Sequence, residues 1–417
     1  MRLHQVILTF LVFAAGAVGF AKEKILTLSW GDVIWQHEGQ GAAALDTPDK
    51  LRESVRTWKD KGVTKVHFRV DDFRILLFHE GARIGGDRYA ELAGRTTRAA
   101  WEQNLVAVAV EALKREGIEI QAYITIFDEG SPPAVIFGNG VPFPWQSRFT
   151  RDHPEFLACD RSPTASGRKY HWGVPEYAYP EVREHMLRMI TTFSDAYAFD
   201  GVFLSIRTHS APPEHADQFG FNEPVVREYE KRYGRNILLQ DFDLAKWRDL
   251  RGEYLTQFLR DVRAHLNAKG QRLAIGIPQG DHLGPPFGNL TLAWRQWVRE
   301  RLVDEIVVGH ISQERARYPR LMQRASGYVQ NQEEGLNLPP IEQDVAESYG
   351  PLCRQHGVKL YVDPERFGYV YAHPAYGPGR QPPEVHARLK QVLEALPDVA
   401  GLTYDYSDIL GLKRSND

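Results

Sequence analysis

The sequence predicts an α/β protein, a (β/α)8 TIM barrel with long loops on the C-terminal face of the barrel. Short β-rich runs alternate with amphipathic helical stretches from residue 25 to residue 404, and this alternation indicates a parallel sheet. Eight such runs are present, which is the number that closes a barrel. An open doubly wound sheet is the alternative, but no glycine-rich phosphate turn follows the first run.

The first half of the chain supplies four predicted strands, over 25–30, 64–70, 118–126 and 201–206. Between them we expect helices over 48–61, 97–116 and 180–197. The first two helices end at Gly62 and Gly117, because glycine commonly follows the last helical residue. The third begins with Pro180 and has Glu181 in its first turn, both favourable at a helix start.

The second half continues the pattern with strands over 273–277, 305–308, 358–362 and 400–404. The expected helices cover 243–268, 291–302, 341–356 and 383–396. About a dozen residues follow the eighth strand, so we expect the last helix to be short or missing. The connections 127–179, 207–242 and 309–340 are long and each follows a strand. They should therefore lie on the C-terminal face, where barrel sites are found.

Residues 1–21 are predicted to be a signal peptide, because a short charged start precedes an apolar run from Val6 to Phe20 and small residues at Gly19 and Ala21. An uncleaved anchor is the alternative, but a membrane span needs about 20 apolar residues. Residues 22–417 then form a single barrel domain of a secreted or periplasmic protein. No later stretch is apolar enough to cross a bilayer, so we expect no membrane contact after cleavage.

Composition narrows the function classes. The net charge of −3 argues against a nucleic-acid partner, which would favour a clustered basic surface. The aromatic content of 11% favours stacking on sugars. Cys159 and Cys353 are too few for a thiolate metal cluster, and their spacing leaves a disulfide open. We expect no cofactor, and the oligomeric state is not determined.

Polar side chains follow nearly every predicted strand. Those expected to bind substrate are Trp30, Asp71, Asp72, Trp172, Arg207, His209, Gln279, His310 and Tyr404. Carboxylates bind sugar hydroxyls, aromatic rings stack on sugar faces, and glycosidic cleavage needs two carboxyl groups. For any one of these residues the alternative is structural, such as capping the next helix or, for Trp172, anchoring a loop. Together they favour a carbohydrate substrate.

Two segments carry a family resemblance. The first segment runs from residues 177–183 through a helix to Phe199-Asp200-Gly201. It resembles the bacterial glycosyl-hydrolase-like barrels related to family 10 glycosylhydrolases, in which a PEVR helix precedes an Asp-Gly strand. Residues 219–225 and 228–234 are similar to segments of the same proteins. The resemblance covers roughly residues 145–240 and implies glycoside hydrolysis by a barrel. It also implies an acid near the end of the fourth strand, where this chain has Ser205. Asp200 starts that strand and is expected to be structural.

Three acids are therefore the catalytic candidates. Glu365 lies just past the seventh strand, between Pro364 and Arg366, and a neighbouring guanidinium would lower its pKa. Asp405 follows the eighth strand and Asp128 follows the third. We expect Glu365 as one member of the pair and Asp405 or Asp128 as the other. A separation of roughly 5 Å would indicate retention of configuration, and about 6.5–9.5 Å inversion.

Two other functions remain open. Without the fourth-strand acid, the barrel would bind a glycan without cleaving it. A metal-assisted hydrolase is the third reading, with His209, His282 and His310 joining Asp71 or Asp72. Arg207 would recognise the charged group of a uronic or sulfated sugar, or else pair with an acid such as Asp128. The sugar, its linkage and the stereochemistry are not determined.

Overall fold

The computed structural model describes residues 22–28, 45, 47–70, 98–131, 145–208, 210, 213, 215, 217–283, 289–310, 338–364, 383–405 and 409. The predicted signal peptide lies outside this part of the chain. So does nearly all of the segment after the eighth strand, where a short or missing helix was expected. Within the described ranges, no helix combines the length and apolarity that a membrane span requires.

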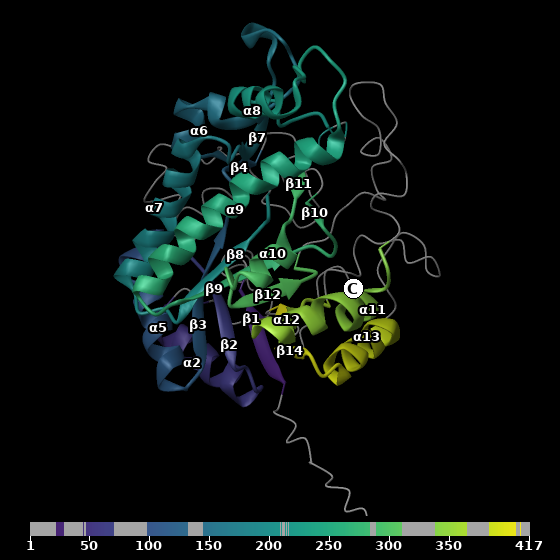
Figure 1. Cartoon of the computed structure of the whole chain (residues 1–417). Coiled ribbons are helices and arrows are strands. Elements are labelled where there is room, and N and C mark those ends of the chain that lie inside the picture. The colour runs from purple at the N-terminus through teal and green to yellow at the C-terminus, as the bar shows by residue number, and fades with distance from the viewer. Residues whose placement is uncertain are drawn as a thin grey trace, which may run out of the picture.

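Eight parallel strands close a barrel, which confirms the predicted fold (Figure 1). Around the barrel they are β1 (Glu23–Thr27), β2 (Lys65–Arg69), β3 (Glu119–Thr125), β8 (Gly201–Ser205), β9 (Arg272–Ile277), β12 (Glu305–Val308), β13 (Lys359–Val362) and β14 (Val399–Asp405). Each predicted strand overlaps one of them. The barrel closes where β1 pairs with β14, with Leu26 opposite Tyr404.

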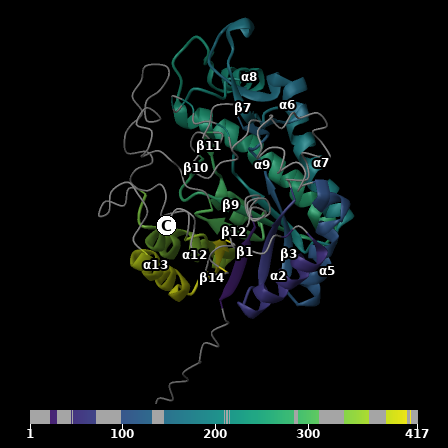
Figure 2. The same cartoon turned by 180° about the vertical axis from the view of Figure 1, so that it is seen from behind.

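Helices surround the barrel, with α2 and α5 on one side and α12 and α13 on the other (Figures 1 and 2). Their bounds are α2 (Pro48–Asp60), α5 (Leu105–Arg115), α7 (Pro180–Ala196), α8 (Glu223–Tyr233), α9 (Leu244–Ala268), α10 (Trp294–Arg299), α11 (Ile341–Asp344), α12 (Gly350–His356) and α13 (Pro383–Ala395). The helix predicted over 97–116 is interrupted at Asn104, which has a left-handed backbone with φ of 51°. The helix predicted over 341–356 contains a π-helical turn at Val345–Tyr349.

The long connections contain helices and strands that the sequence did not predict. After β3 come β4 (Gly130–Ser131), β5 (Trp145–Gln146), α6 (Arg148–Asp152), β6 (Leu157–Cys159) and β7 (Tyr170–Pro175), with 3-10 turns at Pro154–Phe156 and Ala165–Gly167. Helix α8 lies in the connection after β8, and β10 (His282–Leu283) pairs with β11 (Leu290–Thr291) after β9. Figure 1 shows β4, β7, α6 and α8 at the end of the barrel opposite the start of β1.

The interior of the barrel is filled in layers. The middle layer consists of Ile25, Tyr123, Phe203, Ala274, Val307 and Tyr361. Below it, toward the amino ends of the strands, Lys65 Nζ lies 2.6 Å from Glu305 Oε2 and 3.1 Å from Tyr361 Oη. Gln121 Nε2 donates to the same Glu305 oxygen at 3.0 Å. We call Lys65, Gln121 and Glu305 the barrel floor, which the hydroxyl of Tyr361 contacts from the layer above. It is a buried polar network beneath the apolar layer.

Asp200 is structural, as expected. Its Oδ2 accepts a hydrogen bond from Ile120 N at 2.9 Å, and Lys114 Nζ lies 3.5 Å from Oδ1. Asp200 immediately precedes β8, at the amino ends of the strands. It therefore anchors β8 against β3, far along the strand from the end where a substrate would bind.

Both cysteines are free and buried, Cys159 in β6 and Cys353 in α12. Burial raises the pKa of each thiol to about 12, and the thiolate is the form that alkylates. We expect iodoacetamide to leave the native protein unmodified at pH 8. It should label both cysteines after unfolding without a reductant, as measured by intact mass. Protection of both thiols in the unfolded, unreduced chain would show a disulfide instead.

Candidate active site

Five polar side chains meet above the apolar middle layer, at the carboxyl ends of the strands. Arg69 ends β2 and Ser205 ends β8. Asp128, His310 and Asp363 follow β3, β12 and β13. All five are buried, and none is more than 6% exposed. Because parallel strands in a barrel end on one face, residues from distant parts of the chain share this site.

Asp128 forms an ion pair inside the barrel. Its Oδ2 lies 3.8 Å from Arg69 Nη2, and both side chains are almost fully buried. The Arg69 guanidinium also lies over the Tyr123 ring, 5.5 Å from the centroid. In such a low-dielectric setting a neighbouring cation favours the charged carboxylate. The arrangement suits a carboxylate that acts as an anion.

His310 connects two other strand ends. Its Nε2 lies 2.8 Å from Ser205 Oγ, and its Nδ1 lies 3.7 Å from Asp363 Oδ2. The ring occupies the space left by a missing side chain at Gly276, where a Cβ atom would come within 2.6 Å of His310 Cδ2. Phe203 packs edge-on against the ring at 4.9 Å. The imidazole therefore has a fixed position between a hydroxyl and a carboxylate.

A second histidine lies across Phe203. His67 stacks on the Phe203 ring at 3.9 Å, and its Nδ1 lies 3.2 Å from Thr27 Oγ1. Burial, together with the charge of Lys65, lowers the pKa of His67 well below its usual value. His67 is therefore neutral at pH 7 and serves as a hydrogen-bonding group, not as a cation.

Several buried polar atoms of the barrel interior make no hydrogen bond to any residue that the structure describes. Toward the carboxyl ends of the strands they are His67 Nε2, Tyr123 Oη, Thr403 Oγ1 and His310 Nδ1, the last of which lies 3.7 Å from Asp363 Oδ2. Buried polar groups in proteins are almost always hydrogen-bonded. The interior at this end of the barrel is therefore suited to polar groups of a ligand.

Of the residues predicted from sequence, Asp128 and His310 lie in this cluster. Tyr123 connects the two parts of the cluster, because its ring contacts both the Arg69 guanidinium and the His310 ring, whose centroid is 5.9 Å away. Asp405 is the last residue of β14 and lies opposite Thr27. Arg207 is half-buried just after β8. Trp30, Asp71, Asp72, His209 and Glu365 lie outside the described residues.

Three further predicted residues lie in other surroundings. Gln279 is buried, and its Nε2 donates to Pro339 O at 2.8 Å and Asp344 Oδ2 at 2.9 Å, so it joins the chain after β9 to α11. The Tyr404 hydroxyl donates to Glu394 Oε1 of α13 at 3.1 Å, which places the ring on the helix side of β14. Trp172 is half-buried in β7. Their expected contact with substrate stays a prediction.

The metal-assisted reading gains no support from the described residues, where no three His, Cys, Asp or Glu side chains are grouped to hold an ion. His282 Nδ1 lies 3.5 Å from Thr291 Oγ1, in the small β10–β11 sheet. The partners expected for it, His209, Asp71 and Asp72, lie outside the described residues.

Arg69 and Asp363 were not chosen as site residues from the sequence, although a signal for both was present. Side chains alternate between the two faces of a strand. Arg69 is four residues after the inward Lys65, and Asp363 is two residues after the inward Tyr361. Following the alternation along β2 and one residue past β13 would have marked both residues as facing the barrel interior.

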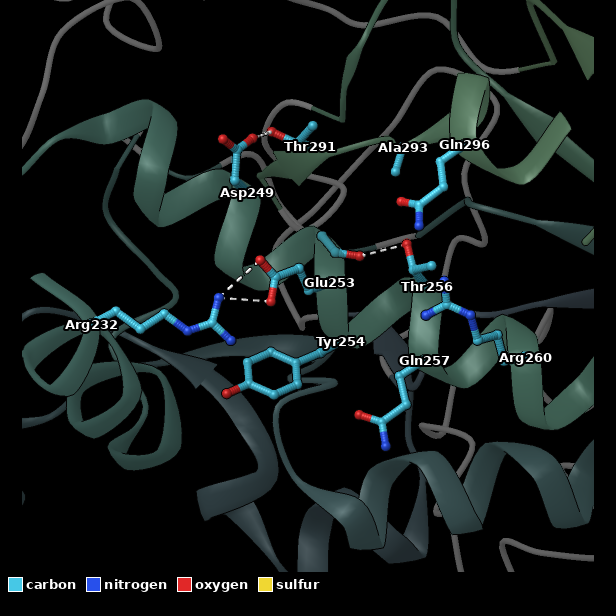
Figure 3. Close-up of a pocket in the computed structure, with 11 residues that line it drawn as sticks. Arg232, Asp249, Glu253, Tyr254, Thr256, Gln257, Arg260, Thr291, Ala293 and Gln296 are labelled. Carbon is cyan, nitrogen blue, oxygen red and sulfur yellow. Dashed lines mark hydrogen bonds and ion pairs between the residues drawn. The ribbon is translucent and has the colours of Figure 1, made fainter. Parts of the chain in front are cut away.

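A pocket of about 570 Å³ lies elsewhere, along the outer helices α8, α9 and α10 (Figure 3). Its charged groups are already paired. Arg232 Nη1 lies 2.8 Å from Glu253 Oε2, and Arg260 Nη2 lies 2.9 Å from Glu300 Oε2. Asp249 Oδ1 accepts from Thr291 Oγ1 at 2.7 Å. We therefore assign the chemistry to the strand ends and not to this pocket.

The resemblance read from the sequence is confirmed. Residues 136–339 match the family described as glycosyl hydrolase-like 10. No curated protein matches the chain. Among solved structures, the PgaB (BpsB) glycoside hydrolase domain from Bordetella bronchiseptica is 13% identical, with a TM-score of 0.47, and the match covers 94% of this chain and 95% of that one.

Two further solved structures are similar at a lower level. The glycoside hydrolase domain of PelA from Pseudomonas aeruginosa is 13% identical over 72% of this chain and 82% of that chain, with a TM-score of 0.33. The α-L-fucosidase isoenzyme 2 from Paenibacillus thiaminolyticus is 11% identical over 92% of this chain, with a TM-score of 0.44. This chain spans 46% of the fucosidase.

Proposed function

We propose that this glycosyl hydrolase-like chain cleaves glycosidic bonds of an oligosaccharide or polysaccharide outside the cytoplasm. The observation that carries the proposal is the buried Asp128, which is paired with Arg69 at 3.8 Å on the carboxyl-end face of the barrel. Glycosidases use one carboxylate as an anion and one carboxylic acid as a proton donor. The surroundings of Asp128 suit the carboxylate that acts as an anion.

The proton donor is proposed to come from the β13–β14 side of the same face. Asp405 ends β14, and Glu365 follows β13 two residues after Asp363. The acid would protonate the leaving glycosidic oxygen, while Asp128 attacks the anomeric carbon or activates a water molecule. Trp172 and Arg207 would then contribute a stacking surface and a charged contact to the sugar.

One observation favours a second candidate, a barrel that binds glycan without cleaving it. Ser205 ends β8, where the family resemblance implied an acid, and its hydroxyl is bonded to His310. If no carboxylic acid donates a proton opposite Asp128, the site would hold a sugar and leave its linkage intact.

Release of reducing ends from neutral, uronic and sulfated glycans distinguishes the two. Asp128→Asn removes the charge with little change of shape, and we expect release to fall about 10²–10⁴-fold, the range lost with an acid–base group. Glu365→Gln and Asp405→Asn, assayed in parallel, identify the partner acid. Asp49→Asn, on the surface at the start of α2, is the matched control and should keep full activity.

Either of two results would contradict hydrolysis by Asp128. Equal release by Asp128→Asn and the wild type would remove Asp128 from the mechanism. Glycan binding by the wild type, measured by calorimetry and with no release from any glycan that binds, would establish the binding barrel instead.

A further inference from the structure

We infer that Ser205, His310 and Asp363 form a nucleophile–base–carboxylate triad that hydrolyses a carboxylic ester of short acyl chain, the type of ester found on O-acylated sugars. The three residues come from the ends of β8, β12 and β13. This activity is separate from glycosidic cleavage, because it acts on a carbonyl carbon and requires neither Asp128 nor a second carboxylic acid.

The three side chains lie in the order that such a triad requires, with the imidazole between the hydroxyl and the carboxylate. Ser205 Oγ lies 2.8 Å from His310 Nε2, within the roughly 2.6–3.2 Å expected between a nucleophile and its base. Asp363 Oδ2 lies 3.7 Å from Nδ1, the other nitrogen of the same ring. This is a charge contact without a hydrogen bond, and catalytic hydrogen bonds often shorten only when substrate binds. Triads are recognised by this geometry and not by chain order, which here is serine, histidine, aspartate.

The surroundings fix the imidazole and supply a further donor. The His310 ring is held between Phe203 and the backbone at Gly276. Tyr123 contacts the ring edge-on at 5.9 Å, and its buried hydroxyl makes no hydrogen bond to any described residue. Preorganised hydroxyl donors stabilise the oxyanion of acyl transfer. Because Ser205 and His310 are buried and aromatic rings pack against His310, the acyl group should be small, of acetyl size.

The reaction balances with water as the only co-reactant. Ser205 Oγ attacks the carbonyl carbon while its proton passes to His310 Nε2. The bond between the carbonyl carbon and the alkoxy oxygen then breaks, and the alcohol leaves with that proton. Water attacks the acyl-serine with His310 as base, which releases the carboxylic acid and restores the serine. Asp363 remains anionic throughout and stabilises the imidazolium.

The first test is covalent labelling of the whole chain with a fluorophosphonate. Ser205 Oγ should bond to phosphorus and displace fluoride, and peptide mass spectrometry should locate the adduct on Ser205. Ser205 and His310 are buried, so the label also tests whether a carbonyl-sized group reaches Oγ. An adduct at another residue, or none, would overturn the triad.

The second test is turnover of p-nitrophenyl acetate and of peracetylated glucose. We expect Ser205→Ala and Asp363→Asn to lose at least 10³-fold in kcat, while Ser54→Ala, a buried serine of helix α2, retains full turnover. Gly276→Ala should also lose turnover, because its methyl group displaces the His310 ring. Wild-type turnover no higher than that of Ser205→Ala would refute the proposal, whatever the outcome of the reducing-end assay.

Discussion

Replacing Lys65 by methionine is expected to lower the free energy of unfolding by about 3–5 kcal/mol, the usual loss when one partner of a buried ion pair is removed. Lys65 is fully buried in the barrel floor, with its Nζ 2.6 Å from Glu305 Oε2 and 3.2 Å from Glu119 Oε1. Methionine fills a similar volume but leaves the Glu305 carboxylate without its nearest cation. Arg272 lies 3.4 Å from the other oxygen and should offset part of the loss.

The pH dependence of this loss has a defined sign. Burial raises the pKa of Glu305 even with Lys65 present, and Lys65 acts to lower it. Removing Lys65 should therefore raise it further. A carboxyl group whose pKa is higher in the folded state than in the unfolded state destabilises the fold as pH rises through that interval. The penalty of Lys65→Met should be small below the unfolded value of 4.5 and complete above the raised folded value.

Urea unfolding followed by circular dichroism at pH 4 and pH 7 measures both effects. The control is the double variant Lys65→Met with Glu305→Leu, which removes the charge together with its partner. Replacing a whole buried pair by apolar residues is often neutral, so the double variant should have a higher urea midpoint than the single variant. If the single variant matched the wild type in urea midpoint, the barrel floor would contribute nothing to stability.

Replacing Gly401 by alanine is expected to cost more than about 3 kcal/mol, at the upper end of overpacking losses. Gly401 lies in β14 opposite Glu23 of β1. A Cβ atom there would overlap the backbone carbonyl of Glu23, and a backbone atom in a paired strand cannot move aside as a flexible side chain can. The substitution should therefore separate the two strands at which the barrel closes.

Gly62→Ala provides the comparison, because a Cβ at Gly62 meets no atom within 4 Å but the backbone φ is +80°. That variant shows the ordinary cost of a left-handed non-glycine residue, about 1–2 kcal/mol. Thermal unfolding of both variants gives the difference. A melting temperature for Gly401→Ala as high as that of Gly62→Ala would mean that the seam tolerates a methyl group.

The eight strands were predictable because each is a short β-rich run bounded by turn residues and separated from the next by a helical segment. The interruption at Asn104 was not, because the residues on both sides share one helical periodicity, and a single left-handed residue leaves no mark in such a pattern. Strands of two residues such as β4 and β10 are too short to show any alternation.

The site was predictable in part. Asp128 and His310 were identified because each directly follows a strand, which fixes the face of the barrel where it lies. The contact of Ser205 with His310 could not be predicted, because the two residues are 105 positions apart in sequence. Knowing which residues end the strands does not show which of their side chains meet. Nor does the position of a residue at a strand end show the direction of its side chain, since the Tyr404 hydroxyl donates to Glu394 of α13.

The pairing of β1 with β14 also sets an order of events during synthesis. β1 pairs with β2 early in the chain, but its second neighbour, β14, follows only after nearly four hundred residues, with Glu23 opposite Gly401. Lys22 Nζ then binds the carbonyl oxygen of Leu396 at 2.8 Å. Contacts between such distant residues form slowly because a long loop must be closed first. A nascent chain therefore cannot close its barrel until nearly all of its strands have been synthesised.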